Sequence, residues 1–244
     1  MLSKNRIKLI KSLSQKKYRQ QHGLFTVEGI KGIQEFLNSE FELESLYTTA
    51  DQFNAPQALT FEISSNDLKK ISSLKTPNTA LAVFKTSKPK TIHIDGLVVA
   101  LDDVRDPGNL GTIIRLCDWY GIKDLVCSEN TVDCYNSKVV QATMGSLSRV
   151  NISYLNLNLF LEETSAEIFG TFMDGQNIYR TSLPTSGIIV MGNEANGISE
   201  AITSKINTKL TIPQFGDQRD TESLNVANAT AIVLSEFMRR TIEM

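Results

Sequence analysis

Three separate segments of this 244-residue sequence hold polar residues that could act on one ligand. The first carries Asn109, an amide, and Arg115, a guanidinium that stays charged. The second carries the carboxylate of Glu194 between two glycines, and the third carries Ser223 and Asn225. Amides, a hydroxyl and a carboxylate can together donate and accept hydrogen bonds around a polar ligand. The chemistry therefore depends on whether the fold brings these three segments to one place.

A predicted strand comes before each segment, at 97–101, 187–191 and 209–212. The first of these is a short apolar run of the kind that fills a buried strand. In an open sheet of parallel strands, ligands bind beyond the carboxyl ends of the strands, so we expect the three segments to form one pocket. Asn109 is expected to cap the helix that follows the first run.

The alternation of strands and helices predicts an α/β fold in which helices cover both faces of a mainly parallel sheet. The polar stretch 87–95 is expected to be a linker. It would separate a small α/β domain at 1–86 from a larger domain at 96–244. The remaining strands of the larger domain are expected near 124–127, 150–153 and 168–173.

Several kinds of site have no counterpart in the sequence. The patterns G-x-G-x-x-G for dinucleotides and G-x-x-x-x-G-K-[ST] for nucleoside triphosphates do not occur. The three cysteines lack metal-ligand spacing and both histidines are isolated, so we expect no metal site, no disulfide framework and no Ser-His-Asp hydrolase. Free cysteines fit a reducing cytoplasm. No apolar stretch approaches the roughly twenty residues that span a bilayer, so we expect no membrane association.

The first twenty residues carry a run of positive charge that no acidic residue interrupts. The formal net charge of the chain is −2, so nucleic-acid binding would have to come from such a local cluster. We expect one helix over about 3–20, with Ile7, Ile10 and Leu13 facing inward. A solvated charged helix is the alternative interpretation. The basic residues are Lys4, Arg6, Lys8, Lys11, Lys16, Lys17 and Arg19.

The last predicted helix, from residue 223 to about 243, is apolar around nearly its whole circumference. Such a helix must be buried on more than one side. Leu116 and Trp119 also lie on the outward side of the helix that begins near Asn109. Either the sheet and neighbouring helices enclose the last helix, or it packs against a second copy of the chain, and the outward Leu116 and Trp119 favour the second copy.

Taken in order, the motifs resemble those of the SpoU/TrmH branch of the SPOUT RNA methyltransferases across about residues 97–240. The N-terminal stretch Gly23-Leu24-Phe25-Thr26-Val27-Glu28-Gly29 resembles the auxiliary RNA-binding domain of this branch, which has a ribosomal-protein-like fold. The connection 217–222 is longer and more polar than in the family, which is expected to change the mouth of the pocket. The matching motifs are Asn109 with Gly111 and Arg115, Gly192-Asn193-Glu194 with Gly197-Ile198-Ser199, and Ile212-Pro213 with Ser223-Leu224-Asn225-Val226.

The resemblance implies an S-adenosylmethionine-dependent enzyme that methylates a ribose 2′-hydroxyl of RNA. It also implies a deep trefoil knot in the C-terminal domain and a homodimer formed through that domain. The N-terminal domain favours ribosomal RNA as the substrate. Transfer RNA is an alternative substrate, and an RNA-binding protein with the same fold but no activity is an alternative of another class.

The same resemblance assigns roles to individual residues. The basic residues of the N-terminal helix become RNA ligands, because neutralising phosphates gives affinity for any RNA sequence. The catalytic residues are Arg115, Asn109, Glu194, Ser223 and Asn225. The cofactor-binding residues are Met191, Gly192, Asn193, Gly197, Ile212 and Leu224.

Arg115 has two possible roles in the family, as the base for the 2′-hydroxyl or as a clamp on the adjacent phosphate. Arginine is far too weak an acid to leave much neutral guanidine at pH 7, so we favour the clamp. On an α-helix Arg115 lies about 120° around and roughly 9 Å along from Asn109, so one ligand in one protomer is not expected to touch both. Arg115 is therefore predicted to reach the pocket of a partner protomer. An ion pair with Asp118 on the same helix is the alternative.

Overall fold

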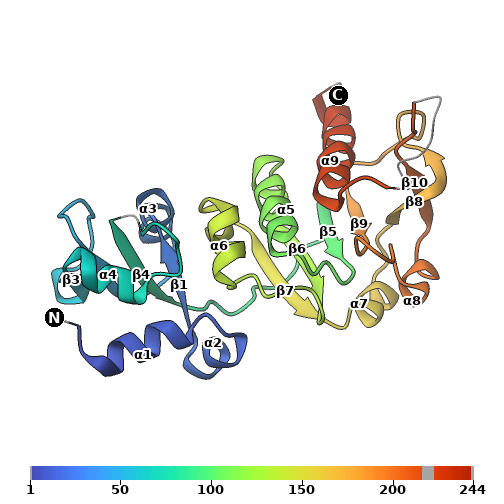
Figure 1. Ribbon diagram of the computed structural model, residues 1–244. Helices are drawn as coiled ribbons and strands as arrows, with labels where there is room; N and C mark the ends of the chain where they lie inside the picture. The colour runs from blue at the N-terminus through green and yellow to red at the C-terminus, as the bar shows by residue number, and fades with distance from the viewer. Residues whose placement is uncertain (1, 78, 216–222, 243–244) are drawn as a thin grey trace. The chain divides into compact units, whose positions relative to one another are not determined.

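The structure is a computed structural model, and it describes residues 2–77, 79–215 and 223–242. The chain divides into two compact units (Figure 1). We call the first the N-terminal unit; it comprises Met1–Lys88 together with Asp133–Arg149. The second, the C-terminal unit, comprises Pro89–Val132 and Val150–Met244. The N-terminal unit therefore includes a segment that the sequence analysis assigned to the larger domain.

The N-terminal unit is built on a four-stranded sheet with the order β1-β4-β2-β3. Only β2 and β3 run parallel, and the other pairs are antiparallel. The strands are β1 (Leu24–Glu28), β2 (Leu43–Thr48), β3 (Thr60–Glu62) and β4 (Ala80–Lys85). The helices are α1 (Lys4–Ser12), α2 (Lys16–His22), α3 (Ile30–Leu37), α4 (Ser65–Ile71) and α6 (Ser137–Thr143), with short 3₁₀ turns at η1 (Gln57–Leu59) and η2 (Ser146–Ser148).

Alternate residues of these strands face opposite sides of the sheet, so both faces carry a core. On one face, α1 and α4 contribute Ile10 and Leu68 to a buried cluster that includes Leu81. On the other face, the core is aromatic: the Phe25 ring lies 5.5 Å from Phe36 and 4.6 Å from Tyr135. Tyr135 belongs to the inserted segment, which explains why that segment is part of this unit.

The prediction of one basic helix over 3–20 is wrong, because the helix is interrupted after Ser12. The hydroxyls of Ser12 and Ser14 donate to the backbone carbonyls of Leu9 and Lys11, in the last turn of α1. The guanidinium of Arg19 donates to the carbonyls of Leu13, at 2.8 Å, and of Ser14, at 3.0 Å. These side chains satisfy carbonyl groups that a continuous helix would have paired internally.

The C-terminal unit is built on a six-stranded sheet with the order β10-β8-β9-β5-β6-β7. Every strand pair in it is parallel, which confirms the prediction of a parallel sheet. The strands are β5 (Leu97–Leu101), β6 (Asp124–Ser128), β7 (Asn151–Leu155), β8 (Ile168–Asn177), β9 (Gly187–Met191) and β10 (Thr208–Thr211). The helices are α5 (Pro107–Trp119), α7 (Leu157–Glu163), α8 (Glu200–Thr203) and α9 (Val226–Ile242).

Within the C-terminal unit, α5 and α9 lie on one side of the sheet and α7 and α8 on the other (Figure 1). The side of α7 and α8 holds a buried cluster that joins Val98 and Val190 of the strands to Leu161. On the side of α9, the Phe237 ring packs edge-on against Phe169 at 5.2 Å. Within the described ranges, no helix is long and apolar enough to cross a membrane.

Two local details of the C-terminal unit differ from the sequence predictions. The cap of α5 is Asp106, whose carboxylate accepts the Asn109 N–H at 2.8 Å; Asn109 itself lies inside the helix. The predicted linker is bound to the sheet unit from Pro89 onward. There, the side-chain oxygen of Asn151 accepts the Lys90 N–H at 2.9 Å.

Candidate methyl-transfer site

A chain of side-chain hydrogen bonds joins the three polar segments singled out in the sequence. The amide nitrogen of Asn109 donates to Glu194 Oε1 at 2.7 Å. The amide nitrogen of Asn225 donates to Asn109 Oδ1 at 2.9 Å. Asn109 is thus the central member, with its donor directed to one segment and its acceptor to the other. The predicted convergence of Asn109, Glu194 and Asn225 is present in the structure.

Asn225 reaches Asn109 because of helix packing rather than strand order. β10, which precedes the third segment, is separated from β5 by two other strands. However, α9, the element that follows β10 along the chain, packs on α5. Asn225 caps α9: its Oδ1 accepts the N–H groups of Ala227 at 3.0 Å and Asn228 at 3.3 Å. One short side chain therefore both starts α9 and holds Asn109.

The loop that presents Glu194 is folded tightly on itself. The backbones of Asn193 and Gly197 exchange two hydrogen bonds, at 2.9 and 2.8 Å. A Cβ on Gly192 would lie 2.3 Å from the carbonyl carbon of Gly197, so no other residue fits at that position without a backbone shift. Gly197 has a φ of 67°, which favours glycine. The Asn193 side chain accepts the Ala195 N–H at 2.9 Å and shapes the tip of the loop.

Asp103, which the sequence analysis did not single out, anchors this loop. Its carbonyl accepts the Asn193 Nδ2 at 2.6 Å, and its N–H donates to Ser128 Oγ at 2.9 Å. Its carboxylate accepts Ser128 Oγ at 3.1 Å and Arg105 Nη2 at 2.8 Å. Asp103 has a φ of 61°, in the left-handed region that few non-glycine residues adopt. It thus joins the loops that follow β9 and β5 to the last residue of β6.

Asp102 fastens the far end of the same loop. It is buried, and its Oδ2 accepts the Ser199 N–H at 2.7 Å. Its own N–H donates to the Met191 carbonyl at 2.9 Å. The sequence held a signal that could have identified Asp102 and Asp103. They are two consecutive acidic residues directly after a buried strand, and such side chains need hydrogen-bond partners.

The remaining predicted cofactor-binding and catalytic residues are distributed around this chain of hydrogen bonds. Met191 is 1 % exposed, so its side chain supports the loop from within the core. Ile212 is half-buried after β10. Ser223 is exposed and precedes the cap residue of α9, and Leu224 leaves half of its side chain exposed beside Asn225.

Arg115 is not part of this constellation in one protomer. It is exposed, six residues beyond Asn109 on α5, which places it about 9 Å further along the helix. Across the described residues, we find no hydrogen bond or ion pair of its guanidinium, so the alternative pairing with Asp118 is not formed. The guanidinium of Arg115 is therefore accessible to a ligand that comes from outside the C-terminal unit.

The side chains that meet at the site are a carboxylate and two amides. Cys117, on the core face of α5, is not a candidate nucleophile, because burial raises the pKa of its thiol to about 12. No group of three or more potential metal ligands is found among residues 2–77, 79–215 and 223–242.

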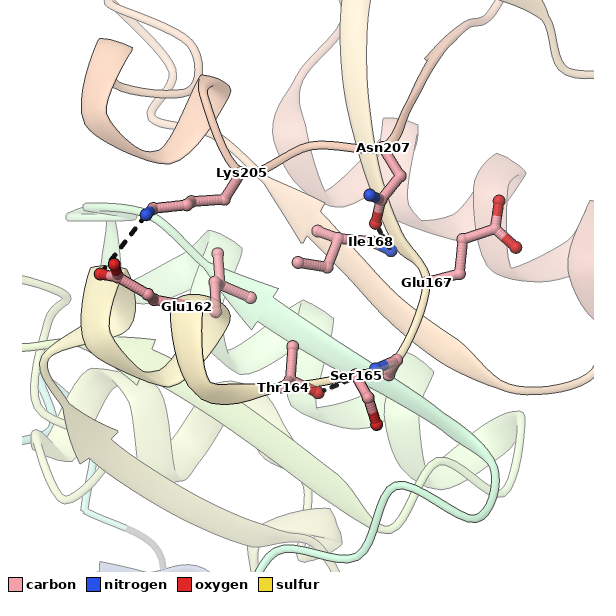
Figure 2. Close-up of a pocket in the computed structure, with 9 residues that line it drawn as sticks. Glu162, Thr164, Ser165, Glu167, Ile168, Lys205 and Asn207 are labelled. Carbon is pink, nitrogen blue, oxygen red and sulfur yellow. Dashed lines mark hydrogen bonds and ion pairs between the residues drawn. The ribbon is translucent and has the colours of Figure 1, made fainter.

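A separate open hollow of about 540 Å³ lies at the opposite edge of the same sheet (Figure 2). It is lined by residues that precede β8 and β10, including Ser165, Glu167 and Asn207. The amino ends of parallel strands lie at this edge, whereas Asn109 and Glu194 follow carboxyl ends. Lys205 and Glu162 form an ion pair at 3.4 Å across part of it. The hollow is thus distinct from the candidate site.

The basic residues of the N-terminal unit differ in their availability to RNA. Arg6 is half-buried, with its guanidinium 5.4 Å from the centre of the Phe61 ring. The expectation that Arg19 binds RNA is wrong: its side chain is 3 % exposed and donates to Asp133 at 2.9 Å. A buried guanidinium that is paired in this way cannot also bind a phosphate. The exposed basic residues are Lys4, Lys8, Lys11, Lys16 and Lys17.

Comparison with known families accounts for nearly the whole chain. The family described as SpoU rRNA Methylase matches residues 96–235, and the domain described as MRM3-like substrate binding matches residues 4–82. A relative is the 23S rRNA (guanosine(2553)-2′-O)-methyltransferase RlmP of Bacillus subtilis, 29% identical over 94% of both chains.

Two solved structures resemble the whole protein. A protein described as a TrmH-family RNA methyltransferase from Porphyromonas gingivalis is 39% identical, with a TM-score of 0.91 over 98% of this chain and 99% of the other. The AdoMet-bound rRNA methyltransferase from Sinorhizobium meliloti is 29% identical, with a TM-score of 0.88 over 98% and 96% of the two chains.

Proposed function

Because the chain belongs to the SpoU rRNA methylase family, we propose that it transfers a methyl group from S-adenosylmethionine to a ribose 2′-hydroxyl of ribosomal RNA. The observation that carries this proposal is the hydrogen-bonded chain of Glu194, Asn109 and Asn225 at the carboxyl edge of the sheet. The 2′-O-methyltransferase activity of the B. subtilis relative, which this chain matches over 94% of both lengths, supports both the reaction and the class of RNA.

The chemistry of the site fits S-adenosylmethionine. The exposed carboxylate of Glu194 complements a cationic ligand, and the half-exposed Leu224 offers an apolar surface to an adenine ring. Backbone groups around Gly192, Ile212 and Leu224 would hold the ligand together with these side chains. When bound, S-adenosylmethionine supplies an electrophilic methyl group on a positively charged sulfur.

The protein's own contribution is positioning. Asn109 and Asn225 orient each other and Glu194, so the polar groups need little reorganisation when the ribose arrives. Arg115 acts as the phosphate clamp beside the 2′-hydroxyl, because the planar fork of a guanidinium fits two phosphate oxygens. Since Arg115 lies about 9 Å along α5 from Asn109, it serves the pocket of a partner protomer.

A homodimer through the C-terminal unit is therefore part of the proposal. The side chain of Trp119 at the end of α5 is 83% exposed, and Ile232 on α9 is half-buried. An exposed tryptophan beside an apolar helix supports a protein–protein interface.

The trefoil knot of the family and a cytoplasmic location are further proposals. The likeness to TrmH-family structures supports the knot, and three buried cysteines that form no disulfide support a reducing compartment.

The test is to measure transfer of a labelled methyl group from S-adenosylmethionine to purified ribosomal RNA and transfer RNA. We expect ribosomal RNA to be methylated at a ribose, and Asn109→Ala to lose most of this activity because both of its side-chain hydrogen bonds disappear. Methylation of transfer RNA alone would assign the alternative substrate. RNA binding without methyl transfer to either RNA would instead support a non-catalytic protein.

A further inference from the structure

The N-terminal unit carries two aromatic rings that lie next to basic side chains near its surface. Phe61, on the edge strand β3, has 37% of its side chain exposed, and the Arg6 guanidinium lies 5.4 Å from its ring centre. On α2, Lys17 Nζ lies 6.0 Å from the centre of the Tyr18 ring, and the Tyr18 ring stacks with His22 at 6.5 Å. Aromatic rings that lie beside cations are the groups on which unpaired nucleic-acid bases stack.

The Phe61 ring is held in place from below. Tyr47, a buried residue of β2, stacks against it with 5.5 Å between the ring centres and 20° between their planes. Phe61 and Tyr47 are directly paired in the β2–β3 register, so the backbone fixes their separation. The Phe61 ring is thus fixed in position before a base binds, which lowers the entropic cost of binding, while the Arg6 guanidinium over the ring has to move outward to make room for the base.

The positive charge on α1, in the same unit as the two rings, suits RNA. Lys4, Lys8 and Lys11 are exposed and follow the i, i+4, i+7 spacing that puts them along one side of α1. The sequence contains no acidic residue before Glu28. A lysine row can bind successive phosphates of a backbone, but it cannot distinguish paired from unpaired bases. The rings are the groups that can.

We propose that the N-terminal unit binds unpaired RNA nucleotides, stacking bases at Phe61 with Arg6 and at Tyr18 with His22 while the α1 lysines bind the phosphates. Arg6 is thus a stacking partner rather than a phosphate ligand. This inference rests on the proposed RNA substrate, and it adds that the recognised region is single-stranded.

The experiment measures the affinity of the full-length protein for a short single-stranded RNA that carries one 2-aminopurine, and for a duplex of the same sequence. Phe61→Leu and Tyr18→Leu keep an apolar side chain but remove the ring. We expect each to weaken single-strand binding about tenfold, to remove part of the stacking quench of 2-aminopurine, and to leave duplex binding unchanged. Lys8→Ala should weaken the binding of both RNAs. It should also reduce the slope of log K against log salt concentration for the single strand by about 0.7.

Phe172→Leu is the matched control, because Phe172 also lies under a cation, Lys209 at 4.7 Å, but belongs to the C-terminal unit. It should bind both RNAs as the wild type does. Titration with S-adenosylmethionine verifies that the C-terminal unit of each variant is folded, and a wild-type-like thermal unfolding transition verifies the N-terminal unit. If the ring variants bind single strands as tightly as the wild type, or lose duplex binding equally, the stacking proposal is overturned while the methyltransferase proposal stands. A wild-type protein that binds neither RNA also overturns the stacking proposal, and the methyl-transfer assay on ribosomal RNA then tests the proposed function by itself.

Discussion

At the scale of single residues, the site depends on short polar side chains that each make several hydrogen bonds. Asn109 and Asn225 use both ends of their amides, and Asp103 uses its N–H, its carbonyl and its carboxylate. Glu194, by contrast, is exposed, with Asn109 as its partner. The position of Glu194 is therefore set mainly by residues that do not themselves need to touch the substrate.

Asp103→Ala should weaken this support in two ways. Alanine tolerates a φ of 61° poorly, at about 1 to 2 kcal/mol, and it has no carboxylate for Ser128 or Arg105. We expect the unfolding free energy to fall by about 2 kcal/mol and kcat to fall about tenfold, measured by chemical denaturation and by single-turnover methyl transfer.

Asp103→Gly separates these contributions, because glycine adopts the same backbone conformation without strain. It should recover part of the activity that Asp103→Ala loses. The double variant Asn193→Ala/Asp103→Ala should be about as active as Asn193→Ala alone, since Asp103 supports the site through Asn193. Fully additive losses of activity in the double variant would contradict that positioning role.

At the scale of elements, the site is the meeting of a loop after β9 with the starts of α5 and α9. The loop is closed by the backbone hydrogen bonds between Asn193 and Gly197, and the two helices are held by capping residues. Because α9 packs on α5, the third segment reaches the site although β10 lies at the far edge of the sheet. The loop geometry is the part most sensitive to a single substitution.

Gly192→Ala should disrupt this loop, because the added methyl carbon would meet the Gly197 backbone at 2.3 Å. The backbone must move, and a displacement on the order of 1 Å can reduce activity about 100-fold. We expect loss of both methyl transfer and S-adenosylmethionine affinity, the latter measured by titration calorimetry. Gly96→Ala is the matched control, since a Cβ there meets no atom within 4 Å. Equal activity of both variants would exclude the steric argument.

At the scale of the whole molecule, the chain passes between its two units three times, at 88/89, 132/133 and 149/150. The inserted segment contributes Tyr135 to the aromatic core and Asp133 to the buried ion pair of Arg19. Deleting residues 1–88 would leave these groups without their partners. RNA recognition is therefore better tested with point variants of the full chain than with truncation.

The proposed dimer makes a further prediction about shared sites. Arg115→Ala and Gly192→Ala should each be nearly inactive as homodimers, because one lacks the phosphate clamp and the other lacks a formed loop. Mixed dimers of the two variants contain one pocket with an intact loop and an arginine from the partner. Methyl-transfer assays on such mixtures should regain about half of the wild-type activity per mixed dimer, as expected for one intact site of two. Mixtures that stay inactive would show that Arg115 serves its own protomer.

The segments that carry the chemistry and the type of fold could both be predicted from the amino-acid sequence alone. Apolar runs followed by turn residues located the strands at 97–101 and 187–191, because burial of a parallel strand requires that pattern. The order of the motifs also identified the family. These features depend on residues that are close together in the chain, so they can be recognised without a structure.

The tertiary structure was needed to show which groups bond to one another and which are buried and so inaccessible to a ligand. It joined Asn225 to Asn109, made Asp103 the anchor of the Glu194 loop, and buried Arg19 against Asp133. Arg19 and Asp133 are separated by 114 positions, so no local pattern could predict that a basic residue in a basic run is neutralised. Long-range pairing of this kind follows from the packing of whole elements, which sequence spacing does not encode.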